Sequence, residues 1–159
     1  MKSRTSSFLS VVVLCLALGD ASWAADTPEP APAAADKLAA ARAQIAARRW
    51  PAALEELKRV NDTRSADWNN LMGYSLRKGA APDLAGAEKY YNEALRIEPG
   101  HRGVLEYSGE LYLMMGDLTK AEQRLTTLEK ACAMQCEEYQ DLKKAVAGFK
   151  AAGNKTVAK

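Results

Sequence analysis

The sequence has few of the residues that catalysis and metal binding need. It contains one histidine, His101, and three cysteines among 159 residues. It has no G-x-x-x-x-G-K-S/T loop for phosphate, no G-x-S-x-G turn for a nucleophilic serine and no paired metal-ligand spacing. His101 follows Pro99 and Gly100, so we interpret it as a turn residue at the start of a helix. We therefore expect no enzymatic activity, no catalytic residue, no metal and no cofactor.

Charge of one sign is not in excess either. The chain has 22 Lys and Arg against 20 Asp and Glu, interspersed along its length, for a formal net charge of +2. This balance argues against a nucleic-acid partner or a membrane-surface footprint. Aromatic residues make up 7% of the chain, and β-branched residues are also sparse. Because Ala, Leu, Glu, Lys and Arg dominate instead, we expect an all-α fold.

A long hydrophobic run occurs only at the N-terminus, from Phe8 to Gly19. Two basic residues precede it and the small residues Ser22 and Ala24 follow it, which is typical of a signal peptide over residues 1–24, cleaved near Ala24. The alternative is an uncleaved N-terminal anchor, but the run is shorter than the roughly 20 residues of a membrane span and so favours the cleaved leader. Cleavage predicts a periplasmic or secreted protein without membrane insertion.

Two further segments flank one predicted domain. Residues 25–35 read ADTPEPAPAAA, and this alternation of proline with small residues predicts an extended linker. We expect residues 152–159 to form a flexible tail. The domain between them, residues 36–151, has a length typical of a single domain.

Four columns of apolar or small residues recur in this domain with a period of 34 residues. Within each copy they fall on one helical face, as Ala87, Tyr91 and Ala94 show by their i, i+4, i+7 spacing. A second amphipathic helix precedes each of these faces, and a break separates the two. The breaks are Arg48-Arg49, Gly79 and Gly116, with Pro51 and Pro82 suited to opening a second helix. The columns are Trp50, Leu84, Leu118; Ala53, Ala87, Ala121; Leu57, Tyr91, Leu125; and Val60, Ala94, Leu128.

Helix–turn–helix units of this length resemble the tetratricopeptide repeat. Gly73, Ala87, Tyr91, Ala94 and Pro99 match its signature in the middle unit, and Gly109, Tyr112, Ala121 and Leu125 match it in the third. The middle unit has two extra residues in its turn, so Gly79–Asp83 is expected to protrude. The small columns are expected where the two helices of a unit cross closely.

The resemblance implies a short right-handed α-solenoid of three helix pairs plus a C-terminal capping helix. The units span about 36–65, 66–101 and 102–135, and the cap spans 136–151. It also implies a non-enzymatic module that binds a peptide or partner protein on a concave face lined by the first helix of each pair. The partner-binding residues expected there are Arg42, Asn70, Tyr74, Arg77, Glu106, Glu110 and Met114. The alternative is a structural assembly or stability factor of the cell envelope that acts through the convex face or the linker.

Cys132 and Cys136 are the only cysteines outside the predicted leader. The 34-residue register places them on either side of a turn between the third unit and the cap. In an exported protein this placement favours a disulfide. Alternatives are a zinc site, which would need two more ligands, a catalytic dithiol, and two free thiols. A helix running through Ala133–Gln135 would separate the Cβ atoms by about 5–6 Å and oppose the disulfide.

Overall fold

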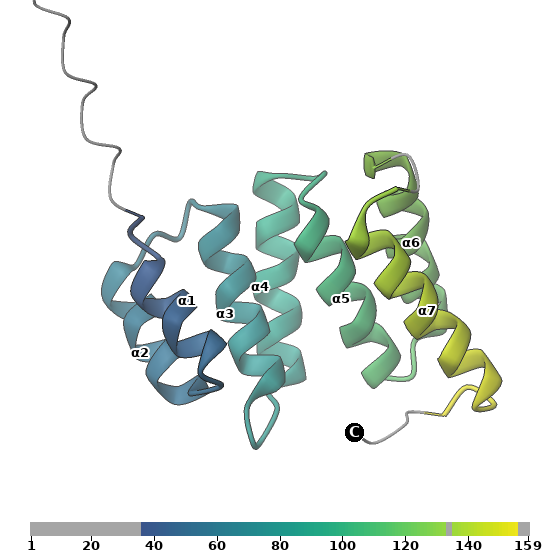
Figure 1. The fold of residues 1–159 in the computed structure, drawn as a ribbon, viewed down its shortest axis with the longest axis horizontal. Coiled ribbons are helices and arrows are strands. Elements are labelled where there is room, and N and C mark those ends of the chain that lie inside the picture. The colour runs from purple at the N-terminus through teal and green to yellow at the C-terminus, as the bar shows by residue number, and fades with distance from the viewer. Residues whose placement is uncertain (1–35, 133–134, 156–159) are drawn as a thin grey trace, which may run out of the picture. The chain divides into compact units, whose positions relative to one another are not determined.

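The computed structural model describes residues 36–132 and 135–155, and these residues form seven α-helices and no strand (Figure 1). The helices are α1 (Ala39–Ala46), α2 (Trp50–Val60), α3 (Ala66–Lys78), α4 (Leu84–Ile97), α5 (Arg102–Met114), α6 (Leu118–Cys132) and α7 (Glu137–Ala151). The predicted signal peptide, the linker and residues 156–159 lie outside the described residues. Within the described ranges, no helix is long and apolar enough to cross a membrane.

Local sequence signals set the helix ends. Pro51 lies in the first turn of α2, where its missing N–H breaks no helical hydrogen bond. The side chains of Ser65 and Asp83 cap α3 and α4 by accepting hydrogen bonds from backbone N–H groups three residues later. Gly116 follows α5 with a φ of 78°, a conformation that favours glycine. Pro82 precedes the cap of α4 and so lies one step earlier than expected.

The small residues of the repeat lie at helix crossings, as expected. Ala53, Ala87 and Ala121 are each 0% exposed. Gly73 is in close contact with the ring of Tyr91 in the second helix of its own pair, because a Cβ atom there would lie 2.7 Å from Cε1 of that ring. A larger side chain at Gly73 would therefore push α3 and α4 apart.

In the third pair, the expected close crossing between the two helices of the pair is not found at Gly109. A Cβ atom on Gly109 would lie 2.6 Å from Leu142 of α7, so the close approach is to the next helix along the chain and not to α6. The reason lies in the column that contains Tyr91. In α6 the residue of this column is Leu125, which is smaller than Tyr91 and only partly buried. The space above Gly109 is therefore occupied by the side chain of Leu142.

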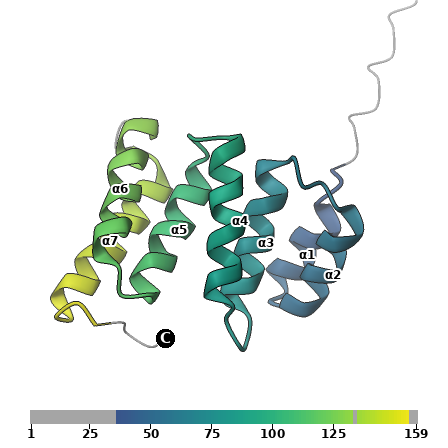
Figure 2. The same cartoon turned by 180° about the vertical axis from the view of Figure 1, so that it is seen from behind.

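The helices of the domain approach one another more closely on one side than on the other. The first helices are in contact along the series α1, α3, α5 and α7, whereas no backbone contact joins α2 to α4 or α4 to α6 within the described residues. The first helices face the viewer in Figure 1 and the second helices do so in Figure 2. The side on which neighbouring helices converge is the concave side of a stacked solenoid.

The two extra residues of the middle pair form the predicted protruding turn. Residues 80–83 are exposed, and the loop between α3 and α4 extends beyond the helix ends in Figure 1. A hydrogen bond from the backbone N–H of Asp83 to the carbonyl oxygen of Leu76, 3.2 Å long, closes the loop. The insertion therefore leaves the helix positions unchanged.

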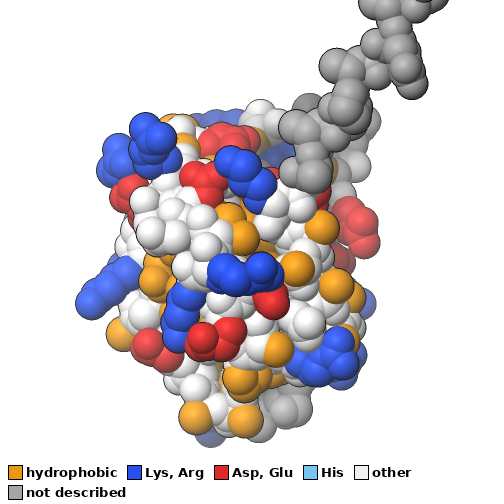
Figure 3. Space-filling model, turned by 90° about the vertical axis from the view of Figure 1, so that its left-hand side faces the viewer, with side chains coloured by type: hydrophobic (Ala, Val, Ile, Leu, Met, Phe, Trp, Pro, Cys, Tyr) orange, Lys and Arg blue, Asp and Glu red, His pale blue; other side chains and the backbone are white. Residues whose placement is uncertain are grey.

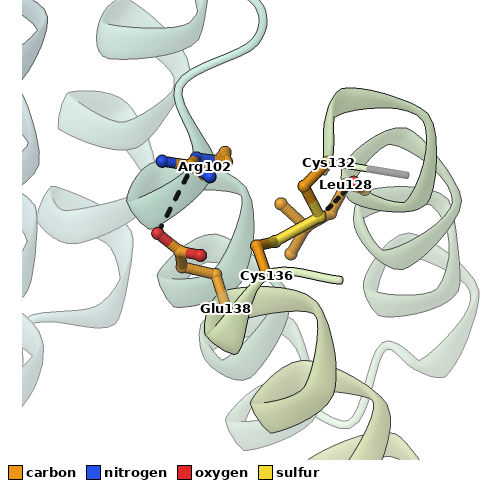
Figure 4. The surroundings of a disulfide bond; sticks show 5 residues. All are labelled: Arg102, Leu128, Cys132, Cys136 and Glu138. Atoms are coloured by element: carbon orange, nitrogen blue, oxygen red, sulfur yellow. Dashed lines mark hydrogen bonds and ion pairs between the residues drawn. A yellow bond between two sulfur atoms is a disulfide. The ribbon is translucent and has the colours of Figure 1, made fainter. Parts of the chain in front are cut away.

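A disulfide joins Cys132 at the end of α6 to Cys136, the residue before α7, with 5.6 Å between their Cα atoms (Figure 4). The chain does not continue as one helix, because α6 ends at Cys132 and α7 starts at Glu137. Residues 133 and 134 lie outside the described residues. The Sγ atom of Cys132 lies 3.1 Å from the carbonyl oxygen of Leu128. Glu138 in the first turn of α7 faces Arg102 of α5 at 3.9 Å, a second link between the cap and the repeats.

Candidate partner-binding face

The side of the domain formed by α1, α3, α5 and α7 is called the first-helix face below. The seven residues predicted to bind a partner come from three of these helices. Arg42 is on α1, Asn70, Tyr74 and Arg77 are on α3, and Glu106, Glu110 and Met114 are on α5. The structure brings three of them, Tyr74, Glu110 and Met114, around a fourth, Arg77.

Arg77 is the centre of this cluster and is only 4% exposed. Its Nη1 atom donates to Glu110 Oε2 at 2.7 Å and lies 4.0 Å from the sulfur of Met114. Its guanidinium lies 5.5 Å from the ring centre of Tyr74 and 5.6 Å from that of Tyr107, distances typical of cation–π contacts. The expectation that Arg77 lines an accessible surface therefore needs correction, because neighbouring side chains enclose its charge.

The aromatic side chains continue this cluster across three helices. Tyr74 and Tyr107 have ring centres 4.7 Å apart, and the ring of Tyr74 also meets Trp50 of α2 edge-on at 5.9 Å. Beneath them lies Tyr91, whose buried hydroxyl has its pKa raised above the ordinary range mainly by burial. Burial alone would lower the pKa of Arg77, but the nearby Tyr91 and Glu110 raise it, so Arg77 stays charged.

Carboxylates gather on the C-terminal half of the same face. Burial, and after it the neighbouring carboxylates of Glu110, Asp141 and Glu138, raise the pKa of Glu106 to about 8, against a smaller lowering by Arg77. These four side chains come from α5 and α7, so the acidic cluster spans the junction between the third pair and the cap. At neutral pH Glu106 therefore stays largely protonated, and the carboxylates around it favour a positively charged ligand, whose approach would lower the pKa of Glu106.

Asn70 presents a different chemistry on the same face. It is 7% exposed, and its Nδ2 atom lies 3.4 Å from the position that a Cβ on Gly103 would occupy. The missing side chain of Gly103 thus makes room for the Asn70 amide between α3 and α5. The Oδ1 atom of Asn70 accepts no hydrogen bond from the described residues. A buried acceptor without a donor costs stability unless a donor is supplied.

A comparison with known protein families supports this arrangement of helices. A family model described as tetratricopeptide repeat matches residues 80–146, from the turn before α4 into α7. Over these residues the chain is a tetratricopeptide repeat region. No curated protein matches the chain at a significant level. Tetratricopeptide repeats generally mediate protein–protein interactions and are typically non-enzymatic.

Arg42, the remaining predicted residue, takes part in a polar chain that crosses all three pairs of the helical domain. Its Nη2 atom donates to Asp67 Oδ2 at 3.0 Å, and Asp67 Oδ1 lies 3.0 Å from Nε2 of His101. The His101 Nδ1 atom accepts a hydrogen bond from the backbone N–H of Val104, so its ring proton lies on Nε2 and is donated to Asp67. The hydrogen bond from His101 is the main cause that lowers the pKa of Asp67.

Sequence reasoning missed Asp67 and Tyr107 and gave His101 only a role in a turn. The repeat gave no signal for Asp67 and His101, because the residue that aligns with His101 in the middle pair is Ser65, the N-cap of α3. Tyr107 gave no signal either, since the equivalent position in the middle pair is Leu71. Only the approach of α3 to α5 brings its ring to Tyr74.

Proposed function

We propose that this chain is an exported scaffold of the bacterial cell envelope that captures a segment of a partner protein on its first-helix face. The observation that carries the proposal is the combination on one face of an unpaired amide oxygen, an aromatic pair and an acidic cluster. Each of these groups suits a different part of an extended peptide. The predicted signal peptide supports export.

The chemistry of these groups describes the partner segment. The Oδ1 atom of Asn70 is buried, so the side chain would rotate outward to accept a backbone N–H of the segment. Tyr74 and Tyr107 would pack against an apolar side chain, since aromatic rings give contact area at low entropic cost. Glu106 and its neighbours would take a Lys or Arg. The proposed partner segment is therefore extended and basic.

The first experiment measures capture of partners from a cell-envelope fraction. The immobilised chain is compared with a variant that carries Asn70→Ala and Tyr74→Ala. We expect the double variant to lose capture while its circular dichroism stays helical. The matched control carries Lys130→Ala and Lys155→Ala, two exposed residues outside the face, and should capture as well as the original chain. Capture that survives the first double variant would contradict the proposal.

A second experiment separates this proposal from a structural role for the linker. A chain without residues 25–35 should still capture its partner, because the first-helix face lies wholly in the helical domain. Loss of capture on this deletion, with capture intact in the Asn70 and Tyr74 variant, would favour an assembly factor that works through the linker. Binding should also weaken as salt rises, since charge pairs at an open face are screened.

A further inference from the structure

The opposite side of the domain carries a second feature, in the gap between α2 and α4. Because the second helices do not converge, each neighbouring pair of them leaves a gap floored by a first helix. Between α2 and α4 this gap is a pocket of about 520 Å³. That volume lies in the range of pockets that hold ligands. The corresponding gap between α4 and α6 is bridged by side chains.

The repeat register explains why the two gaps differ. In the second gap, Arg124 of α6 donates to Asn92 of α4 at 3.2 Å, and Lys120 pairs with Glu88 at 3.6 Å. Each of these residues has a counterpart 34 positions earlier in the first gap. The counterparts of Arg124 and Asn92 are Tyr90 and Lys58, and those of Lys120 and Glu88 are Gly86 and Leu54. No hydrogen bond or ion pair joins Tyr90 to Lys58, and Gly86 and Leu54 have no polar side chain to form one, so the first gap stays open.

The floor and one wall of the pocket are apolar and rigid. Trp68 is 3% exposed, and its indole Nε1 donates to the carbonyl oxygen of Leu57 at 2.7 Å, which fixes the ring. Tyr90 meets Trp68 edge-on with 5.7 Å between ring centres, and Met72 completes the floor. Aromatic walls with a flexible thioether between them favour an aromatic or long aliphatic side chain.

The rim of the pocket is positively charged. Lys58, Arg64 and Lys89 line it, against one carboxylate, Glu93. Glu93 accepts two hydrogen bonds from Arg96, at 2.8 and 2.7 Å, so its charge is already compensated. Arg64 and Lys89 form no ion pair with another described residue, and Lys58 pairs only with Glu55 of its own helix. Charge complementarity therefore favours an anionic ligand.

We propose that the pocket between α2 and α4 binds an acidic peptide segment of a partner protein, in which carboxylates flank one large apolar side chain. The apolar side chain enters between Trp68, Met72 and Tyr90, and the flanking carboxylates pair with Arg64 and Lys89. This site lies on the second-helix side and is separate from the first-helix face. The domain would thus hold two segments of opposite charge on its two sides.

The test uses the full chain and the pentapeptide EDFDE, which carries a fluorophore on its N-terminal amine. Fluorescence anisotropy should show saturable binding. Arg64→Glu with Lys89→Glu should raise Kd at least about tenfold, because it replaces attraction by repulsion at the rim. The control, Lys130→Glu with Lys155→Glu, changes the net charge equally but lies outside the pocket, and should change Kd by less than about twofold. Equal Kd values for the two variants, or no binding at millimolar peptide, would overturn the proposal.

A cross-linking arm locates the apolar side chain. Benzoylphenylalanine replaces the phenylalanine of the peptide, and the photoproduct is mapped by mass spectrometry. The proposal expects attachment to Met72 or its pocket neighbours. Attachment to Met114 on the first-helix face would overturn it and would leave the proposed capture on that face standing. The alanine peptide EDADE should bind more weakly than EDFDE, and similar binding of the two would also count against an apolar pocket.

Discussion

The two ends of the helical domain meet solvent with helices of different design. α1 has 8 residues and buries only Ala41, whereas α7 has 15 residues and buries Tyr139, Leu142, Val146 and Phe149. Each contacts two other helices, α1 with α2 and α3, and α7 with α5 and α6. The small side chains of α1 remove little apolar surface from water, so the same scheme of contacts stabilises this end less.

Polar links reinforce the difference. α7 is tied to α6 by the disulfide and by an ion pair between Lys150 and Glu122. α1 has no side-chain cap at its N-terminus, and its links are ion pairs of Arg42 with Asp36 and Asp67 at the surface. Figure 3 views the domain from the side of α1 and α2 and shows basic and acidic side chains interspersed there with hydrophobic ones. In a stack where each repeat holds only its neighbours, the α1 end should open first.

The largest expected effect is a difference between two leucine truncations. Leu142 is 0% exposed and packs on Gly109, so Leu142→Ala should leave a cavity that costs about 2–5 kcal/mol. Leu38, at the residue before α1, should cost about 1–2 kcal/mol when truncated, because the end of the stack can relax around it. Urea unfolding of both variants measures the difference. Equal losses would mean that the α1 end is as well packed as the cap.

The second prediction concerns the disulfide. In the chain-entropy model a loop this short contributes about 2 kcal/mol, so reduction should loosen α7 and leave the repeats folded. Hydrogen exchange with and without reductant should show lost protection confined to residues 137–151. The variant with Cys132→Ser and Cys136→Ser should match the reduced chain and should not respond to reductant. Protection lost equally in α1 would show that the two ends are coupled.

The third prediction uses the acidic cluster at the junction of α5 and α7. The pKa of Glu106 is raised to about 8, so between its ordinary value near 4.3 and that value the folded chain holds more protons than the unfolded chain. Stability should therefore fall as the pH rises through this window. Glu106→Gln should remove the fall and raise Tm at about pH 9 relative to the original chain, with little difference at about pH 4.

The matched control for this prediction is Glu98→Gln, an exposed residue at the end of α4 outside the cluster. Its melting curves should follow those of the original chain at every pH. If the Glu106 variant also follows them, the carboxylates of α5 and α7 do not repel one another in solution. The same result would weaken the proposed binding of a basic segment, because carboxylates that do not repel one another gain less from a nearby positive charge.

Much of the fold was predictable because the repeat fixes spacing and burial together. The columns at Ala53, Ala87 and Ala121 identified the second helices, and all three residues are fully buried. The positions of Cys132 and Cys136 followed from the same register. The burial of Arg77 did not, because a pattern of apolar residues assigns arginine to the surface. Its enclosure depends on Tyr107 and Glu110 of the next pair, which no local spacing relates to it.

The open gap between α2 and α4 could have been found from the sequence, although only by comparing columns across repeats. Lys58 aligns with Asn92, and Tyr90 aligns with Arg124, so the sequence shows that the residues bridging α4 and α6 are replaced in the first gap. The sequence does not give the side-chain orientation of Trp68, which decides whether the gap is filled. That orientation is set by its hydrogen bond to Leu57.

The smallest expected effect is at the α1 end. Arg42→Ala removes the ion pairs to Asp36 and Asp67, all of which are exposed, so the loss should be below about 1 kcal/mol and should vanish at high salt. His101 lowers the pKa of Asp67, so the contribution of this carboxylate is present above its ordinary pKa and is lost as the pH falls through its lower folded value. Hydrogen exchange at neutral pH should therefore show faster exchange in residues 39–46 of the Arg42 variant and no change in α7. Unchanged exchange in α1 would mean that its packing on α2 and α3, and not the polar chain, holds this end of the domain.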